Sequence, residues 1–162
     1  MTARWLTLEE QHAWRAYMVG TTLLMERLDR DLREGHGLSL PEYEILVRLS
    51  EAPEHRLRMA ELADSVKNSR SRITHAVTRL EKAGLVERSQ CTSDGRGVFA
   101  ILTDHGYHRL VAMAPDHVAS VRAALIDVVS SDDLAAIRRG LLAVAEGLQT
   151  GGPDPLLSEQ PA

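Results

Sequence analysis

Cysteine is almost absent from this sequence of 162 residues, and the one cysteine, Cys91, cannot form an intramolecular disulfide. A secreted domain held together by disulfides is therefore excluded, and a reducing compartment is expected. The chain also lacks any apolar run of about 18 residues, so no membrane-spanning helix is predicted. Its first residues, MTARWLTLEEQ, lack the basic and then apolar pattern of a secretion signal. Together these absences predict a cytoplasmic protein.

An excess of positive charge is missing as well, because the formal net charge is −4 at pH 7. That total alone argues against a nucleic-acid-binding protein. The charge is unevenly distributed, however, since residues 56–96 contain nine basic and five acidic residues and the rest of the chain carries a net charge of −8. A local basic segment suits a patch that binds a polyanion, and a solvated face without a partner is the alternative.

Helical spacing dominates the apolar residues, which make up 44% of the chain. Ser39 and Glu42 have the spacing of a capping box, so a helix is predicted to begin after Ser39. Pro115 lies within another helical pattern and should kink or split that helix. The remaining long helices are predicted over residues 8–34, 104–127 and 131–148.

The basic segment itself contains two short helical patterns. After an expected loop at residues 52–56, helices are predicted over residues 59–66 and 70–83, with a tight turn between them. Ser69 is well placed as the N-cap of the second helix. Two short helices joined in this way form a helix-turn-helix unit.

The pattern then changes from helix to strand. The segments LVERSQC and VFAILT are typical of strands, and Asp94-Gly95 between them is a strong signal for a hairpin turn. The fold class predicted from these patterns is mainly α with a small β-hairpin.

One face of the predicted helix at residues 70–83 has the chemistry of a DNA-reading surface. Ile73, Val77 and Leu80 mark its buried side, and the opposite side presents hydroxyls, an imidazole and cations. Arginine pairs with guanine edges in the major groove, and hydroxyls bond phosphates or base edges. The alternative is a polar helix with no partner. The predicted DNA-contacting residues of this segment are Ser69, Arg70, Ser71, Arg72, Thr74, His75, Thr78 and Lys82.

The predicted hairpin supplies a second contact. Arg96 lies just past the turn, and an arginine on such a tip can enter a narrow minor groove. Asp94 is predicted to hold Arg96, or an arginine of the preceding helix, through a charge-assisted bond. A simple turn-forming role for Asp94 is the alternative.

At this point the sequence resembles the MarR family of winged helix-turn-helix regulators. The resemblance rests on LADSV followed by SRSRITHAVTRLEKAGLVERS, and on SDGRGVFAILTDHG. The second segment follows the family's pattern of D-x-R, an apolar strand and L-T-x-x-G. The chain departs from the family at Lys67 and Asn68, where a glycine and an aliphatic residue are frequent. The matching positions of the second segment are Asp94, Arg96, Leu102, Thr103 and Gly106.

The resemblance implies a ligand-responsive repressor that binds a palindromic DNA operator as a homodimer. It also implies that the outer helices of two subunits interlock, because a winged lobe alone cannot cover such long apolar helices. The organisation expected is an N-terminal dimerisation helix at 1–38, the DNA-binding lobe at 39–103, C-terminal dimerisation helices at 104–150 and a flexible tail at 151–162.

A small aromatic effector is a further expectation from the resemblance. The residues proposed to line its pocket are Trp14, Tyr17, Met18 and Tyr43, although at helical spacing such residues are more often core. Cys91 beside arginines could sense oxidants or be an ordinary cysteine. His105, His108 and His117 raise the question of a metal, but their spacing contains no tight i, i+4 pair, and no metal or cofactor is predicted.

An enzyme is not predicted, because none of the common motifs for nucleophiles, phosphate loops or catalytic zinc occurs. A winged helix that binds only protein is the remaining alternative to a DNA-binding regulator.

Overall fold

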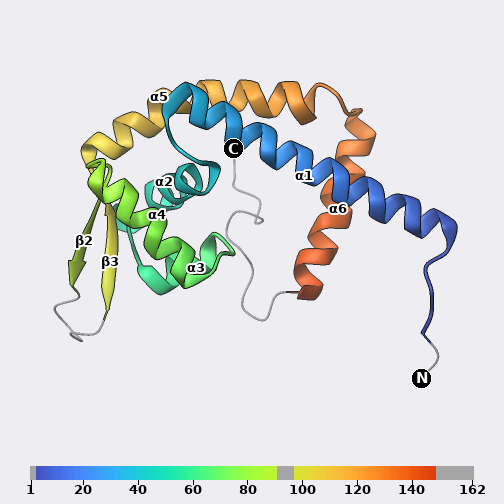
Figure 1. Cartoon of the computed structure of the whole chain (residues 1–162), viewed down its shortest axis with the longest axis horizontal. Helices are drawn as coiled ribbons and strands as arrows, with labels where there is room; N and C mark the ends of the chain where they lie inside the picture. Colours follow the sequence, from blue (N-terminus) through green and yellow to red (C-terminus); the bar gives the residue numbers. More distant parts are fainter. Residues whose placement is uncertain (1–2, 91–96, 149–162) are drawn as a thin grey trace.

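The computed structural model describes residues 3–90 and 97–148 and shows a helical protein with one small antiparallel sheet (Figure 1). The predicted fold class, mainly α with a β-hairpin, is confirmed. The elements are α1 (Leu8–His36), α2 (Leu40–Glu51), a 3-10 turn (Pro53–His55), β1 (Arg56–Arg58), α3 (Met59–Ser65), α4 (Arg70–Lys82), β2 (Val86–Gln90), β3 (Val98–Leu102), α5 (Asp104–Val121), a π-helical turn (Arg122–Ile126) and α6 (Ser131–Leu148).

Side-chain caps fix the helix starts where the sequence predicts them. Ser39 and Glu42 form a complete capping box at the start of α2. The Ser69 hydroxyl accepts a hydrogen bond from the backbone N–H of Arg72, so Ser69 is the N-cap of α4. Thr103 caps α5 in the same way, through the N–H of Gly106. These bonds satisfy N–H groups that have no partner within the helix.

The sheet has the order β1-β3-β2, and its first strand was not predicted. The predicted loop at residues 52–56 instead contains the 3-10 turn, and a strand begins at Arg56. Arg56 pairs with Ile101 and Arg58 with Phe99, so β1 is a strand because β3 lies beside it. Three residues with two arginines carry no strand pattern of their own, which explains the error.

The turn between α3 and α4 is strained at the position where the sequence departs from the family. Lys67 has a φ of 50°, in the left-handed region that favours glycine. For a residue with a Cβ this conformation costs roughly 1 kcal/mol. The N–H groups of Lys67 and Asn68 bond back to Asp64 and Ala63, at 3.3 and 3.1 Å, and these bonds close the turn.

Helix α5 runs without a break through Pro115, so of the two outcomes predicted there, a kink or a split, the split does not occur. Its start is fixed by a close approach to the loop before β2. A Cβ on Gly106 would overlap the carbonyl oxygen of Leu85, so only glycine fits at this position. This approach joins the beginning of α5 to the sheet and gives a physical reason for the glycine of the L-T-x-x-G pattern.

The core lies inside the lobe made by α2, α3, α4 and the sheet, with α5 packed against it. Ile45, Leu46, Leu49, Leu62 and Leu80 are fully buried there. Burial of side chains of this size supplies the main stabilisation of such a lobe.

The outer helices are far less covered. In the part of the chain that the structure describes, α6 has no buried residue, and the buried residues of α1 are Leu28 and Leu32 near its end. Figure 1 shows α6 apart from the helices and strands of the lobe. No helix among the described residues is both long and apolar enough to span a bilayer. The exposed apolar residues of α1, α5 and α6 include Trp14, Tyr17, Met18, Val19, Leu23, Met25, Val111, Val118, Ile137, Leu141, Val144 and Leu148.

Candidate nucleic-acid interface

Helix α4 turns one face to the core and the opposite face to solvent, as the sequence predicts. Ile73, Ala76, Val77 and Leu80 are buried against the lobe. Of the residues predicted to contact DNA, all of those on α4 except Thr78 are exposed. The exposed ones, including the N-cap, are Ser69, Arg70, Ser71, Arg72, Thr74, His75 and Lys82.

The cations of this face have their charge available for a partner. Among the described residues, no hydrogen bond or ion pair holds the side chains of Arg70, Arg72 or Lys82. Arg70 and Arg72 stand in the first turn of α4, where the helix dipole adds partial positive charge. Positive charge is therefore concentrated at the start of α4. Such a surface suits a nucleic acid, whose phosphates and base edges accept hydrogen bonds.

The two threonines of α4 contribute less than the sequence suggests. The hydroxyl of Thr74 donates to the carbonyl of Arg70, and that of Thr78 donates to the carbonyl of Thr74, both at 2.8 Å. Thr78 is also half-buried beneath Arg88. Their hydroxyl protons are therefore already used within the helix.

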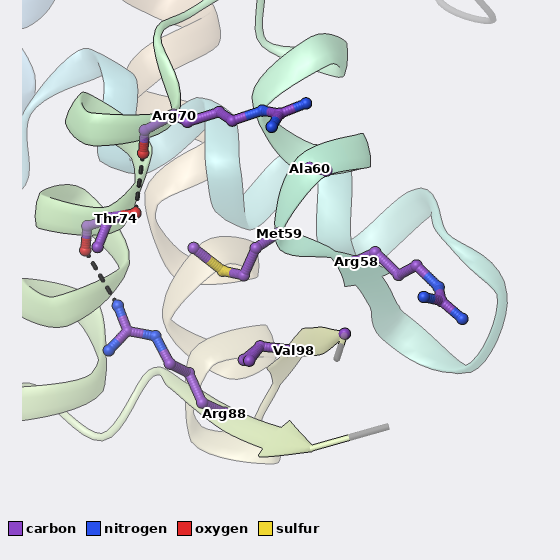
Figure 2. A pocket seen from close by; sticks show the side chains of 8 residues that line it. Arg58, Met59, Ala60, Arg70, Thr74, Arg88 and Val98 are labelled. Carbon is purple, nitrogen blue, oxygen red and sulfur yellow. Dashed lines mark hydrogen bonds between the residues drawn. The ribbon is translucent and has the colours of Figure 1, made fainter. Parts of the chain in front are cut away.

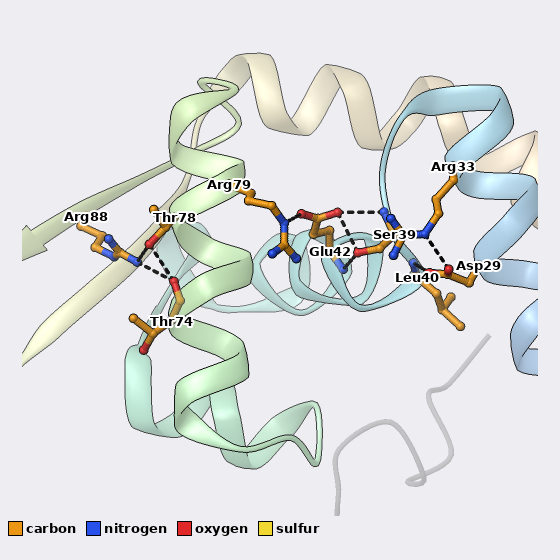
Figure 3. A network of polar contacts seen from close by, with 9 residues as sticks. All are labelled: Asp29, Arg33, Ser39, Leu40, Glu42, Thr74, Thr78, Arg79 and Arg88. Carbon is orange, nitrogen blue, oxygen red and sulfur yellow. Dashed lines mark hydrogen bonds and ion pairs between the residues drawn. The ribbon is translucent and has the colours of Figure 1, made fainter.

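Arg88 on β2 is a functional candidate that sequence reasoning missed. Its Nη2 donates to the carbonyl of Thr74 at 3.0 Å and to the hydroxyl of Thr78 at 2.9 Å (Figure 3). Its Nη1 pairs with Glu81 of α4 at 3.0 Å. Arg88 thus fastens the hairpin to the recognition helix α4 and balances the charge of Glu81. Since these partners are seven to fourteen residues away, no local pattern could have revealed the contact.

A hollow of about 560 Å³ lies between α4 and the sheet (Figure 2). Arginines of three different elements line it, one each from β1, α4 and β2. Met59 and Val98 make its floor partly apolar, and Figure 2 shows both between the arginines. The hollow extends the basic character of the α4 surface toward the hairpin. Its lining residues are Arg58, Met59, Ala60, Arg70, Thr74, Arg88, Gly97 and Val98.

The predicted hairpin contacts cannot be placed. Asp94, Arg96 and Cys91 lie outside the described residues. The strands that carry the hairpin, β2 and β3, are described and are paired from Val86 with Leu102 to Gln90 with Val98.

The residues predicted to line an effector pocket differ in burial, since Tyr43 is buried and Trp14, Tyr17 and Met18 are exposed. Tyr43 is buried and packs against His117 of α5, with ring centroids 4.4 Å apart. Trp14 and Tyr17 stack on each other at 6.1 Å on the exposed first half of α1, next to exposed Met18. Tyr43 therefore belongs to the buried core cluster of the lobe, and an effector pocket at these residues stays a prediction.

The histidines do not assemble a metal site in residues 3–90 and 97–148, since no group of three possible ligands occurs there. The Nδ1 of His108 bonds the carbonyl of Asp104 at 2.7 Å. His117 is partly buried, its Nδ1 has no partner within the described chain, and burial lowers the pKa of its ring below the ordinary value. A neutral His117 beside Tyr43 is a packing residue.

Comparison with known proteins agrees with this geometry. The sequence model of the MarR family matches residues 38–98. The chain is 34% identical over 91 residues to the HTH-type transcriptional repressor YetL of Bacillus subtilis (strain 168), and this match covers 56% of the chain but only 54% of that repressor. It therefore spans about half the length of that curated relative.

Two solved structures match over nearly the whole chain. A MarR family transcriptional regulator from Streptomyces coelicolor in complex with DNA is 49% identical, with a TM-score of 0.89, over 93% of this chain and 94% of that one. AbsC, a MarR family regulator from the same organism, is 46% identical, with a TM-score of 0.84, over 90% of this chain and 98% of that one. Both proteins are MarR family transcriptional regulators and not enzymes. With such identity over almost its full length, this chain belongs to the MarR family of transcriptional regulators.

Proposed function

We propose that the chain is a repressor that binds double-stranded DNA sequence-specifically, as a homodimer on a palindromic operator. The observation that carries the proposal is the exposed face of α4, where Arg70 and Arg72 have no partner among the described residues. In a helix-turn-helix protein the second helix lies in the major groove with its first residues at the base edges. The DNA complex of the relative that is 49% identical supports this role.

The homodimer is supported by the uncovered outer helices. In the described part of the chain no residue of α6 is buried, so its apolar stripe needs another surface to remove it from water. A second copy of the same helices provides a complementary surface through two-fold symmetry. Two α4 helices related in this way would read half-sites about one helical turn apart.

The hairpin is proposed to act as a wing in the minor groove. In this arrangement Arg96 enters the narrow groove, and Asp94 orients an arginine by a charge-assisted bond. Arg96→Ala should weaken DNA binding and reduce its salt dependence, whereas an unchanged affinity in a mobility-shift titration would remove the wing contact from the proposal.

Regulation is proposed to use a small aromatic effector, held where the outer helices of two subunits meet. Trp14, Tyr17 and Met18 are exposed in the single chain and would line such a site only when the second copy is present. The repressor role follows the relative YetL, which is a repressor. A cytoplasmic location, where the chromosome of a bacterium lies, suits this role.

Selection of bound sites from random duplexes tests the proposal. The expected result is a two-fold symmetric consensus whose half-sites are about one helical turn apart. Arg72→Ala should weaken the base preference of the consensus at the positions that α4 contacts. Recovery of no enriched sequence at low salt would instead favour the alternative, a winged helix that binds only protein.

A further inference from the structure

One nearly buried carboxylate ties the recognition helix to the rest of the chain. Only 6% of the Glu42 side chain is exposed, and its Oε1 accepts from Nε of Arg79 at 2.5 Å. Its Oε2 accepts from the backbone N–H and the hydroxyl of Ser39, at 2.8 and 2.7 Å. Arg79 belongs to α4, so these bonds join α4 to the first turn of α2 (Figure 3).

The start of α2 is also tied to α1. Asp29 Oδ1 accepts from the backbone N–H of Leu40 at 2.8 Å, and Asp29 Oδ2 accepts from Nε of Arg33 at 2.6 Å. Leu40 directly follows the N-cap Ser39. Figure 3 shows the resulting path from Arg33 and Asp29 of α1, through the start of α2, to Arg79 of α4. The proposed dimerisation helix and the recognition helix are therefore connected by consecutive polar contacts.

The electrostatics of this connection favour a geometric role. Burial by itself would raise the pKa of Glu42, but the hydrogen bonds from Ser39 and Arg79 outweigh it and hold that pKa below its ordinary value. The carboxylate is therefore charged at neutral pH. A buried ion pair adds little net stability, because desolvation offsets the attraction, but it penalises any arrangement in which the partners separate. Movement of α4 away from α2 would leave the Glu42 charge buried without its cation.

We propose that Glu42 is a positioning residue that sets where α4 stands relative to α1, and so sets the half-site spacing that the dimer accepts. This inference rests on the proposed function, since spacing has meaning only for a dimer bound to two half-sites. Glu42 is buried and does not reach DNA, whereas Arg79 is 60% exposed and could contact a phosphate as well. Glu42 is therefore the informative residue to change.

The test compares Glu42→Gln with the wild type on duplexes whose half-site spacing is optimal, or one base pair shorter or longer. The readout is the ratio of affinities for optimal and altered spacing. A variant that was merely less stable would lose affinity equally on every duplex, so its ratio would not change. We expect Glu42→Gln to lower this ratio by about fivefold, the lower end of usual coupling between sites. Glu51→Gln, an exposed carboxylate on the same helix without a described partner, should retain the wild-type ratio.

If Glu42→Gln folds poorly, Arg79→Gln still tests the contact, because it removes the same ion pair from its exposed partner. Where both variants fold, the double variant completes a cycle. If the pair acts as a unit, the double variant should change the ratio no more than the larger single change. A wild-type ratio in Glu42→Gln and Arg79→Gln, or an equal loss in Glu51→Gln, would overturn the inference while leaving DNA binding intact. A wild-type protein that prefers no duplex at all would overturn the proposed function, and this inference with it.

Discussion

The DNA-binding lobe and the outer helices differ in how they bury their apolar surface. The lobe closes its own core, with Leu46, Leu49, Leu62 and Val77 fully buried. Helix α6 also carries an apolar stripe, but none of its residues is buried within the described chain. Charge divides the chain similarly, since residues 56–96 are basic and the remainder carries −8. The lobe thus buries its apolar side chains within one chain, whereas the outer helices leave an apolar surface exposed that the proposed second copy would cover.

The largest effect is expected when the outer surface is made polar. Leu141→Glu places a charge on the exposed apolar stripe of α6. In a dimer that charge would be buried without a partner, so dissociation and a loss of DNA affinity of about 100-fold are expected. Sedimentation measures the first and a mobility-shift titration the second. Leu141→Met, which keeps the volume and the apolar character, should stay dimeric. A dimeric Leu141→Glu would show that α6 lies outside the interface.

A disruptive substitution in the lobe should instead lower the free energy of unfolding. Gly106→Ala would drive a methyl group into the Leu85 carbonyl oxygen, and we expect a loss of about 2–3 kcal/mol in the free energy of unfolding. Gly35→Ala is the matched control, because a Cβ there meets nothing within 4 Å and α-helix favours alanine. Urea denaturation measures both. Equal stability of the two variants would contradict the close approach of α5 to the sheet.

The recognition helix should respond in affinity and not in stability. Arg72 is exposed and has no described partner, so Arg72→Ala should leave thermal unfolding unchanged. DNA affinity should fall about tenfold, and the slope of log K against log salt should fall by about 1. Titrations at three salt concentrations measure this slope. Arg30→Ala, an exposed arginine of α1, is expected to change the slope much less.

The smallest effect concerns the boundary between the two regions. Burial lowers the pKa of His117 from its ordinary value of 6.5, so an unfolded chain takes up this proton more readily than the folded one. Its contribution to stability is therefore complete above pH 6.5 and declines as the pH falls below that value. His117→Phe should flatten the stability profile below about pH 6.5. Urea midpoints across this range measure the slope, and identical slopes in both proteins would be inconsistent with a neutral buried ring.

The sequence predicts those features whose causes are local. The capping box of Ser39 and Glu42 and the N-cap Ser69 follow from neighbouring residues, and so does the outward face of α4. Strand β1 and the contacts of Arg88 were missed, since each depends on a segment distant in the sequence. Tyr43 and Trp14 were left open as core or pocket residues, because helical spacing cannot tell the two apart, and the burial of Tyr43 depends on distant segments.

The central claim is that two copies of this chain present their α4 helices to one duplex. Sedimentation of the protein with a duplex carrying the selected two-fold symmetric site tests it directly. We expect one complex containing two chains of 17.9 kDa per duplex, formed without an intermediate containing one chain. If the protein sediments at low salt as a monomer that does not bind the duplex, the account is contradicted.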